Sequence, residues 1–417
     1  MRLLVAVSGG SDSTGLLVAL KEHATPDFTV MAATVDHGLR PESADEARHV
    51  AALCSRLHVP HTTLVWKGEK PLTGVAAAAR EARYQLLCDA AEEVCANAIL
   101  TGHTLDDQLE TVAMRSSRGG REDARGLAGM ADMVLLHRRH WLLRPLLQTR
   151  REDIRNFLRQ HKKVWIDDPS NSDQKNERAR MRKALEPGSP VSAAEINNAG
   201  LRRQDLSRAA AGLLAEHATC HQSVLIHLSP NAFNAEPAVL RYALWACAAV
   251  AGGREQGPTP DAMQKVLALV TDGVPGRLTA GRVVFDLRRE GLFLCRESRD
   301  LPALTVEPAG SVSWDGRFRV INNSKGAVRV GPSSMSRQDA QAVFLHAPSS
   351  VAVRAARSVS EIYSTSGETQ GLTATPMLAP FDRFLPRFDL DLARMLAQLT
   401  RCDNFPPLPI MDYERKR

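Results

Sequence analysis

Long apolar runs are the first feature that this 417-residue sequence lacks. A helix that crosses a bilayer takes about 18–20 apolar residues. The longest uninterrupted apolar run, Tyr242–Ala251, has about half that length. The N-terminus enters the apolar segment Leu3–Val7 without the basic stretch and small-residue cleavage site of a secretory leader. We therefore expect a cytoplasmic protein with no membrane partner.

Paired cysteines are also missing. The sequence has seven cysteines, an odd number, and no two are spaced as Cys-x-x-Cys. The pattern argues against a disulfide framework, a zinc site and an iron–sulfur site, and it fits a reducing compartment. The cysteines, which we expect to be mostly small core residues, are Cys54, Cys88, Cys95, Cys220, Cys247, Cys295 and Cys402.

Charge is unevenly distributed along the chain. The net charge is +6, but the tract 115–203 has 20 Lys and Arg against 11 Asp and Glu. Such a basic tract favours a polyanionic partner, RNA or DNA, and the alternative is a set of solvated helix faces. With 44% hydrophobic and 24% charged residues, the chain belongs to the soluble globular class, and its length predicts two or three domains.

The first hundred residues alternate between short apolar segments and helical patterns, which is typical of a parallel α/β sheet. The expected strands are Leu3–Val7, Thr29–Val35, His61–Trp66 and Ala98–Thr101. The expected helices between them are Ser13–His23, Ser43–Leu57 and Gly74–Cys95. The predicted fold class is therefore α/β, a Rossmann-like parallel sheet flanked by helices.

The rest of the chain predicts two further parts. We expect a domain at 1–190 that contains this sheet and a mainly helical domain at 191–300 that ends in a hairpin, Gly281–Leu287 with Gly291–Cys295. Residues 301–417 predict a small C-terminal module, partly flexible, with a helix near Leu390–Leu399. The boundary near residue 190 follows from the turn-forming residues Pro187–Pro190.

The segment Ser8-Gly9-Gly10-Ser11-Asp12-Ser13 lies between the first strand and the first helix. Glycines let backbone N–H groups turn towards a phosphate, and the following helix adds its positive end. The Gly-Lys-Ser/Thr ending of a Walker A loop is missing. The alternative is an ordinary glycine-rich turn.

Three more segments carry charged groups; two of them lie at the ends of expected strands, where ligands bind in such sheets, and the segment with Arg80 lies on an expected helix. Asp36 lies in Val35–Arg40 and Arg80 in Ala79–Tyr84; a strand-ending turn and a solvated ion-pair stripe are the alternatives. The third segment carries His103, Asp106, Asp107 and Glu110 at helical spacing. Clustered carboxylates repel one another unless they hold a cation, so we expect Mg²⁺ or an ammonium group there.

Taken together and in this order, these segments resemble the bacterial tRNA(Ile)-lysidine synthetases, which are PP-loop enzymes of the N-type ATP pyrophosphatase class. The resemblance covers about residues 1–185 and weakens through 276–299. The strings that carry it are Ser-Gly-Gly-x-Asp-Ser at 8–13, Val-Asp-His-Gly-Leu-Arg at 35–40, Ala-Arg-Glu-Ala-Arg-Tyr at 79–84, His-x-x-Asp-Asp-Gln-x-Glu-Thr at 103–111, Gly-Leu-Ala-Gly-Met at 126–130 and Asp-Asp-Pro-Ser-Asn at 167–171.

The resemblance implies a ligase that uses ATP, Mg²⁺ and L-lysine to convert the wobble cytidine of tRNA(Ile) into lysidine. It also implies that 1–190 is the catalytic domain and that 191–300 contacts the tRNA. It implies that ATP binds Ser8, Gly9, Gly10, Ser11, Asp12 and Ser13, with Asp12 also near Mg²⁺. The implied catalytic residues are Asp12, Asp36, Arg80, His103, Asp107 and Glu110. The alternatives are a PP-loop tRNA thiolase and a catalytically inactive RNA-binding relative. The oligomeric state is left open, with a homodimer as one assembly to test.

Overall fold

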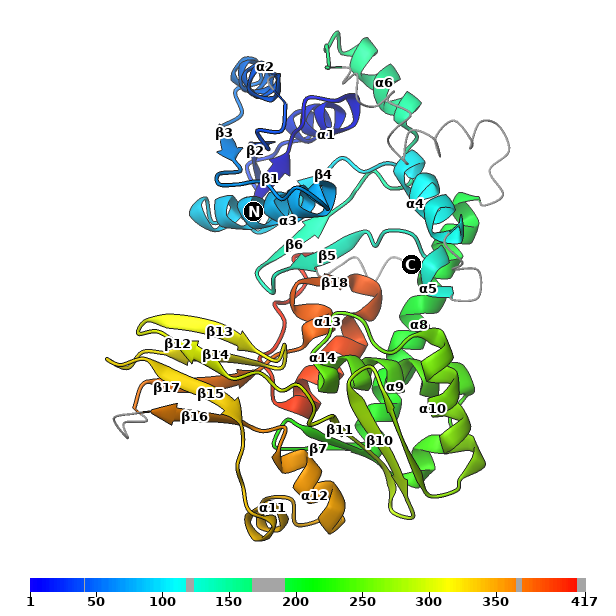
Figure 1. The fold of residues 1–417 in the computed structure, drawn as a ribbon. Helices are drawn as coiled ribbons and strands as arrows, with labels where there is room; N and C mark the ends of the chain where they lie inside the picture. Colours follow the sequence, from blue (N-terminus) through cyan, green and yellow to red (C-terminus); the bar gives the residue numbers. More distant parts are fainter. Residues whose placement is uncertain (41, 118–123, 167–191, 365–369, 411–417) are drawn as a thin grey trace. The chain divides into compact units, whose positions relative to one another are not determined.

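The structure is a computed structural model, and it describes residues 1–40, 42–117, 124–166, 192–364 and 370–410 (Figure 1). The chain forms two compact units. The first contains Met1–Arg203, Pro386–Phe388 and Pro406–Arg417, and the second contains Gln204–Leu385 and Asp389–Phe405. Among the described residues, no helix is long and apolar enough to cross a membrane.

The first unit is built on a mostly parallel sheet with the strand order β5-β6-β4-β1-β2-β3. The pairs β1–β2, β1–β4, β2–β3 and β4–β6 are parallel, and β5–β6 is antiparallel. Its strands are β1 (Arg2–Ala6), β2 (Thr29–Asp36), β3 (His61–Val65), β4 (Ala98–Thr101), β5 (Met133–Leu136) and β6 (His140–Leu143). This arrangement confirms the predicted α/β class.

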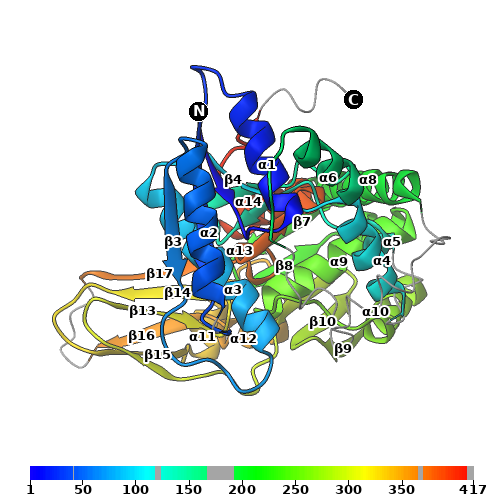
Figure 2. The same cartoon turned by 90° about the horizontal axis from the view of Figure 1, so that it is seen from above.

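Helices cover both faces of this sheet. In Figure 1, α3 lies on the opposite side of the strands from α1 and α2. Helices α1 and α6 pack against each other (Figure 2), and Val18 of α1 shares a buried cluster with Ile154 and Leu158 of α6. The helices are α1 (Ser11–Glu22), α2 (Ser43–Arg56), α3 (Val75–Glu93), α4 (Leu105–Ser117), α5 (Ala124–Leu127) and α6 (Arg151–Gln160).

The second unit contains an antiparallel sheet with the order β7-β8-β11-β10-β9. The predicted hairpin is present as β10–β11, and it pairs further with β8 and β9. The strands are β7 (Ala218–His221), β8 (Leu225–Leu228), β9 (Gly276–Ala280), β10 (Val283–Arg288) and β11 (Gly291–Arg296). The accompanying helices are η2 (Pro230–Asn234), α9 (Pro237–Gly252) and α10 (Pro260–Asp272).

Two smaller antiparallel sheets follow, β12-β15-β16 and β13-β14-β17. Their strands are β12 (Leu304–Val306), β13 (Gly310–Trp314), β14 (Phe318–Asn322), β15 (Val328–Pro332), β16 (Ser360–Ser364) and β17 (Leu372–Pro376). Helices α11 (Arg337–Val343), α12 (Ser349–Ala356), α13 (Ala379–Asp382) and α14 (Leu390–Thr400) complete the unit. Three elements include residues of both units: α8 (Ala193–His217), β18 (Phe384–Pro386) and η3 (Arg387–Asp389).

One hydrophobic core joins the chain before and after residue 300. The same buried cluster contains Leu225 and Phe293 together with Trp314, Val330 and Val351. The sequence pattern after residue 300 predicts only the helix that is observed as α14. The proposed three-part division stays a prediction, because its first boundary lies within 167–191, outside the described residues, and the contacts group the chain into two units.

Candidate active site

The loop between β1 and α1 is held by its own serine hydroxyls. The Ser8 N–H donates to Ser13 Oγ at 3.1 Å, and the two Oγ atoms lie 3.2 Å apart. Gly9 has φ +89, a conformation that favours glycine, and a Cβ there would lie 2.8 Å from Cδ1 of Ile166. The α-helix begins at Ser11, so its positive end adjoins the loop.

This loop lies where the strand order of the sheet reverses. Strand β1 has β2 on one side and β4 on the other, and ligands bind at such a switch point beyond the strand ends. The turn after β4 touches the loop directly. A Cβ at Gly102 would lie 2.7 Å from the carbonyl oxygen of Asp12, so only glycine fits. The residues that follow β4 are thereby placed against the loop.

Arg151, which the sequence analysis did not single out, joins Asp12 of the loop to Asp107 and Glu110 of α4. These three carboxylates form the acidic cluster. Arg151 Nε donates to Asp12 Oδ2 at 2.8 Å and Arg151 Nη2 donates to Asp107 Oδ1 at 3.2 Å. Its Nη1 lies 3.9 Å from Glu110 Oε1. The Arg151 side chain is 16% exposed, and the Glu110 side chain 3%. Among the described residues, the site thus contains its own cation, and the cluster of these four groups keeps an excess of two negative charges.

Burial alone lowers the pKa of the Arg151 guanidinium, but the carboxylates of Asp107, Asp12 and Glu110 raise it above its usual value. Arg151 therefore stays charged in the folded protein. The only signal for Arg151 in the sequence is its place beside Arg150, where α6 begins. Nothing in the local pattern separates it from the other basic residues of the tract 115–203.

The two neighbouring aspartates of α4 have different roles. Asp106 Oδ2 accepts the backbone N–H of Arg151 at 2.8 Å, which supplies α6 with the cap that its own N-cap residue lacks. Asp107 Oδ2 accepts the N–H and the hydroxyl of Thr104, both at 2.8 Å. Asp107 Oδ1 is the oxygen that contacts Arg151.

The other predicted site residues have contacts within their own segments. Asp36 ends β2, and its Oδ1 accepts the N–H of Gly38 at 2.8 Å. His103 Nδ1 lies 2.9 Å from Thr101 Oγ1. The Arg80 guanidinium lies 4.9 Å from the ring centre of Tyr84. The contacts through Arg151 and Gly102 are those that bring Asp12, Asp107 and Glu110 together.

Helix α4 also fixes the segment 126–130. Gln108 Nε2 donates to the carbonyl of Met130 at 3.0 Å, and the Met130 N–H donates to Gln108 Oε1 at 2.6 Å. Arg115 Nη1 donates to the carbonyl of Gly129 at 2.8 Å. The Gly-Leu-Ala-Gly-Met string at 126–130 is therefore packed against α4, the helix that carries Asp107 and Glu110. The Asp-Asp-Pro-Ser-Asn string at 167–171 lies outside the described residues.

Part of the basic tract is internal to the first unit. Arg144 is 2% exposed and donates to the carbonyl of Ala131 at 2.6 Å. Arg139 pairs with Asp89 and Glu92. These arginines, like Arg151, stabilise the fold, so the surface available to a polyanion is smaller than the count along the sequence indicates.

The fold and the loop define the class of the protein. Residues 1–189 match the PP-loop domain family. With a mostly parallel sheet and a Ser-Gly-Gly loop at its switch point, the first unit has the N-type ATP pyrophosphatase fold.

Similar curated proteins narrow the class to one family. The chain is 40% identical over 430 residues to the tRNA(Ile)-lysidine synthase of Rhizobium meliloti (strain 1021), a match that covers 99% of this chain and 94% of that protein. It is 39% identical to the tRNA(Ile)-lysidine synthase of Mesorhizobium japonicum, over 98% and 94% of the two chains. It is 33% identical to the tRNA(Ile)-lysidine synthase of Bartonella tribocorum, over 81% of this chain and 80% of that protein. The chain belongs to the tRNA(Ile)-lysidine synthase family.

Proposed function

We propose that this chain is the ligase that joins L-lysine to C2 of the wobble cytidine of tRNA(Ile). The C2 carbonyl oxygen of the cytidine attacks the α-phosphorus of ATP, and pyrophosphate leaves. A lysine amine then attacks C2 and loses a proton, and AMP departs with the former carbonyl oxygen. The observation that carries the proposal is the contact of the acidic cluster with the phosphate loop, through Gly102 and Arg151, in a chain of this family.

The loop Ser8–Ser13 binds the phosphates in this proposal. Its backbone N–H groups and the N-terminal end of α1 favour negative charge, and the Ser8, Ser11 and Ser13 hydroxyls are further donors. Arg80 stabilises the charge that develops on the leaving pyrophosphate. Donors that the fold holds in place lower the reorganisation that accompanies the reaction.

The donor set at Asp12 fits Mg²⁺. Among the described residues, no group of three or more His, Cys, Asp or Glu side chains could hold a metal alone. Mg²⁺ commonly uses one or two carboxylates together with substrate phosphates and water. Asp12, which is 18% exposed and adjoins the phosphate loop, is suited to that role. When bound, the ion neutralises phosphate charge.

The acidic cluster binds lysine in this proposal. Asp107 and Glu110 accept hydrogen bonds from its amino groups, because the cluster keeps two negative charges after Arg151 is counted. A lysine amine must lose a proton to attack, and His103 or one of the carboxylates takes it. Asp36, at the end of β2, belongs to the same catalytic group.

The proposed tRNA contacts use the exposed part of the basic tract, with phosphate contacts giving salt-dependent affinity and the anticodon bases giving edges to read. A cytoplasmic location and a homodimer are parts of the proposal that need their own tests. The rival thiolation reaction is not favoured, because the named relatives are lysidine synthases.

The decisive experiment incubates the protein with ATP, Mg²⁺, lysine and a tRNA(Ile) transcript, then digests the RNA for mass spectrometry. We expect cytidine at the wobble position to gain the mass of lysine less water. A transcript with uridine at that position is the matched control and should stay unchanged. ATP cleavage that depends on sulfide, without lysine uptake, would contradict the proposal.

A further inference from the structure

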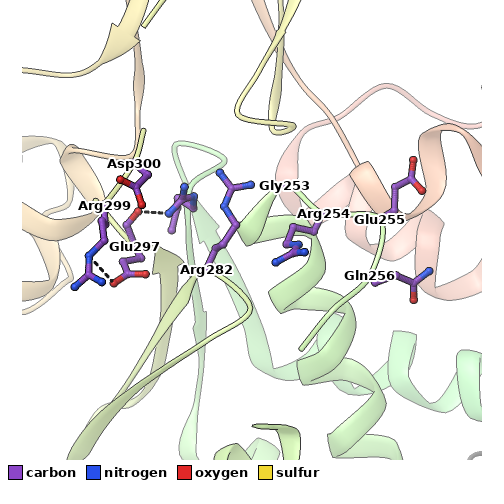
Figure 3. Close-up of a pocket in the computed structure, with 9 residues that line it drawn as sticks. Gly253, Arg254, Glu255, Gln256, Arg282, Glu297, Arg299 and Asp300 are labelled. Carbon is purple, nitrogen blue, oxygen red and sulfur yellow. Dashed lines mark hydrogen bonds and ion pairs between the residues drawn. The ribbon is translucent and has the colours of Figure 1, made fainter. Parts of the chain in front are cut away.

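A cavity of about 710 Å³ lies within the second unit (Figure 3). Its walls come from the residues after α9, from the turn between β9 and β10, and from the end of β11 with the residues that follow it. The lining is unusually rich in arginine, with Arg254, Arg282, Arg296 and Arg299.

Beneath this cavity, and among the described residues, three guanidinium groups contact one carboxylate. Arg296 Nε lies 3.0 Å and Arg317 Nε 2.8 Å from Asp315 Oδ2, and Arg282 pairs with Oδ1. The Asp315 side chain is fully buried. One negative charge thus faces three positive charges in a region of low dielectric constant.

Backbone geometry builds this arrangement. Asp315 and Gly316 form the turn between β13 and β14, with φ values of +54 and +70. A turn tip is usually solvated, but this one packs against the end of α9: a Cβ at Gly253 would overlap the carbonyl oxygen of Asp315. The turn therefore carries its aspartate into the interior.

The remaining charged groups near the cavity do not cancel the excess positive charge of the three arginines around Asp315. Glu255 pairs with Arg383 at 2.9 Å, and Glu297 lies 3.9 Å from Arg299. The exposed Asp300 adds one negative charge. Among the described residues, the Arg254 guanidinium makes no hydrogen bond or ion pair, and so an excess of two positive charges remains for the whole group.

Arg296 and Arg317 hold neighbouring segments of the chain in place, whereas Arg254 and Arg282 are available to a ligand in the cavity. Arg296 donates to the carbonyl of Glu297, and Arg317 Nη1 donates to the carbonyl of Ser358 at 2.7 Å. Burial, with Arg296 and Arg282 close by, lowers the pKa of Arg317 to about 10 although Asp315 opposes the shift. Arg282 is 34% exposed, and Figure 3 shows Arg254 and Arg282 between Glu297 and Glu255.

We propose that this cavity binds a phosphate group, which Arg254 and Arg282 contact directly. A guanidinium fork matches two oxygens of a phosphate and remains charged at any physiological pH. Asp315 positions Arg282, and the buried Arg296 and Arg317 add attraction for an anion. The phosphate comes either from the backbone of a bound RNA, in which case the inference rests on the proposed function, or from free phosphate or pyrophosphate.

The test compares Arg254→Gln, Arg282→Gln and the double variant with a control, Arg289→Gln. Arg289 is an exposed arginine in the β10–β11 turn, so the control loses the same charge elsewhere in the unit. Calorimetry measures binding of inorganic phosphate and pyrophosphate with the ATP loop saturated by a non-hydrolysable ATP analogue. Filter binding measures the affinity for a tRNA(Ile) transcript across a salt series. Because Arg254 has no ion-pair partner among the described residues, its variant should fold normally, which circular dichroism checks.

We expect the variants, unlike the control, to lose phosphate binding. If the phosphate belongs to RNA, the affinity for tRNA also falls roughly tenfold and the salt slope falls by about 1 for each arginine removed. If tRNA binding matches the control, the phosphate is a free one. Unchanged phosphate and tRNA binding in all variants overturns the proposal. Failure of the wild-type chain to bind tRNA counts against the proposed function instead, and the phosphate measurement still decides this site.

Discussion

Replacing Arg151 with methionine removes the cation at the centre of the acidic cluster while keeping a side chain of similar length. In the native site the guanidinium donates to Asp12 at 2.8 Å and to Asp107 at 3.2 Å, and it lies 3.9 Å from Glu110. The variant leaves these carboxylates close together and mostly buried, with no cation between them among the residues that the structure describes.

Removing one partner of a buried ionic group costs about 3–5 kcal/mol, because the remaining charge stays desolvated. The matched control is Arg159→Met on the same helix. Arg159 pairs with Glu152 at 2.7 Å, but the two side chains are 53% and 60% exposed. Such a solvated pair contributes about 0–1 kcal/mol. The two substitutions should therefore differ by at least about 2 kcal/mol.

The difference in stability between the Arg151→Met and Arg159→Met variants should also depend on pH. Without Arg151, the mutual repulsion of the carboxylates favours proton uptake in the folded state, so this state binds more protons than the unfolded chain does. Stability then falls as pH rises, and the loss is larger at pH 8 than at pH 5. Urea unfolding at both pH values gives the free energies, and hydrogen exchange of α4 and α6 locates the change. A loss at pH 8 equal to that of Arg159→Met would refute the reasoning.

Three further predictions concern the chemistry of the site. Asp12→Ala should abolish AMP formation with little loss of tRNA binding, and surviving activity would place the phosphate site elsewhere. Gly102→Ala should weaken ATP binding at least roughly tenfold, since its Cβ would lie 2.7 Å from the Asp12 carbonyl oxygen; Gly212→Ala, where a Cβ meets open space, is the control and should stabilise α8 by about 0.5–1 kcal/mol. Glu110→Gln should raise the KM for lysine roughly tenfold or more, through a lost charge-assisted hydrogen bond, and leave adenylation of tRNA unchanged. Equal losses in both half-reactions would show that Glu110 does not act on lysine.

The fold of the first hundred residues could be predicted because its central strands, β1 and β4, are buried on both faces. Strand β1 has three consecutive buried residues, Leu3, Leu4 and Val5, and such runs stand out in a sequence. Strand β13 is different. Only Trp314 of its five residues is fully buried, and the others are small, polar or partly exposed, so nothing separates it from a loop. Its place in the fold comes from pairing with β14 and from the core around Trp314.

The candidate site could be predicted in part for a related reason. Asp107 and Glu110 lie three residues apart on α4, so their shared helix face follows from spacing alone, whereas His103, expected on the same face, lies before the helix begins at Leu105. Arg151 lies 44 residues after Asp107 and reaches the cluster only because α6 packs on α1. Long-range packing of this kind has no local pattern, so the spacing of the carboxylates predicts a bound cation but not the arginine that the structure adds to the cluster.

The two charged clusters of this chain follow one physical principle with opposite signs. Near the phosphate loop, and among the described residues, three carboxylates share one arginine; in the second unit three arginines share one aspartate. In each cluster the lone opposite charge lowers the repulsion between the like charges, and it leaves an excess of two charges. A ligand of opposite charge then gains attraction from groups already held in position, and little of its binding energy is used to assemble them. The excess therefore indicates the sign of the ligand in each case: a cation beside the loop, and an anion in the arginine-lined cavity.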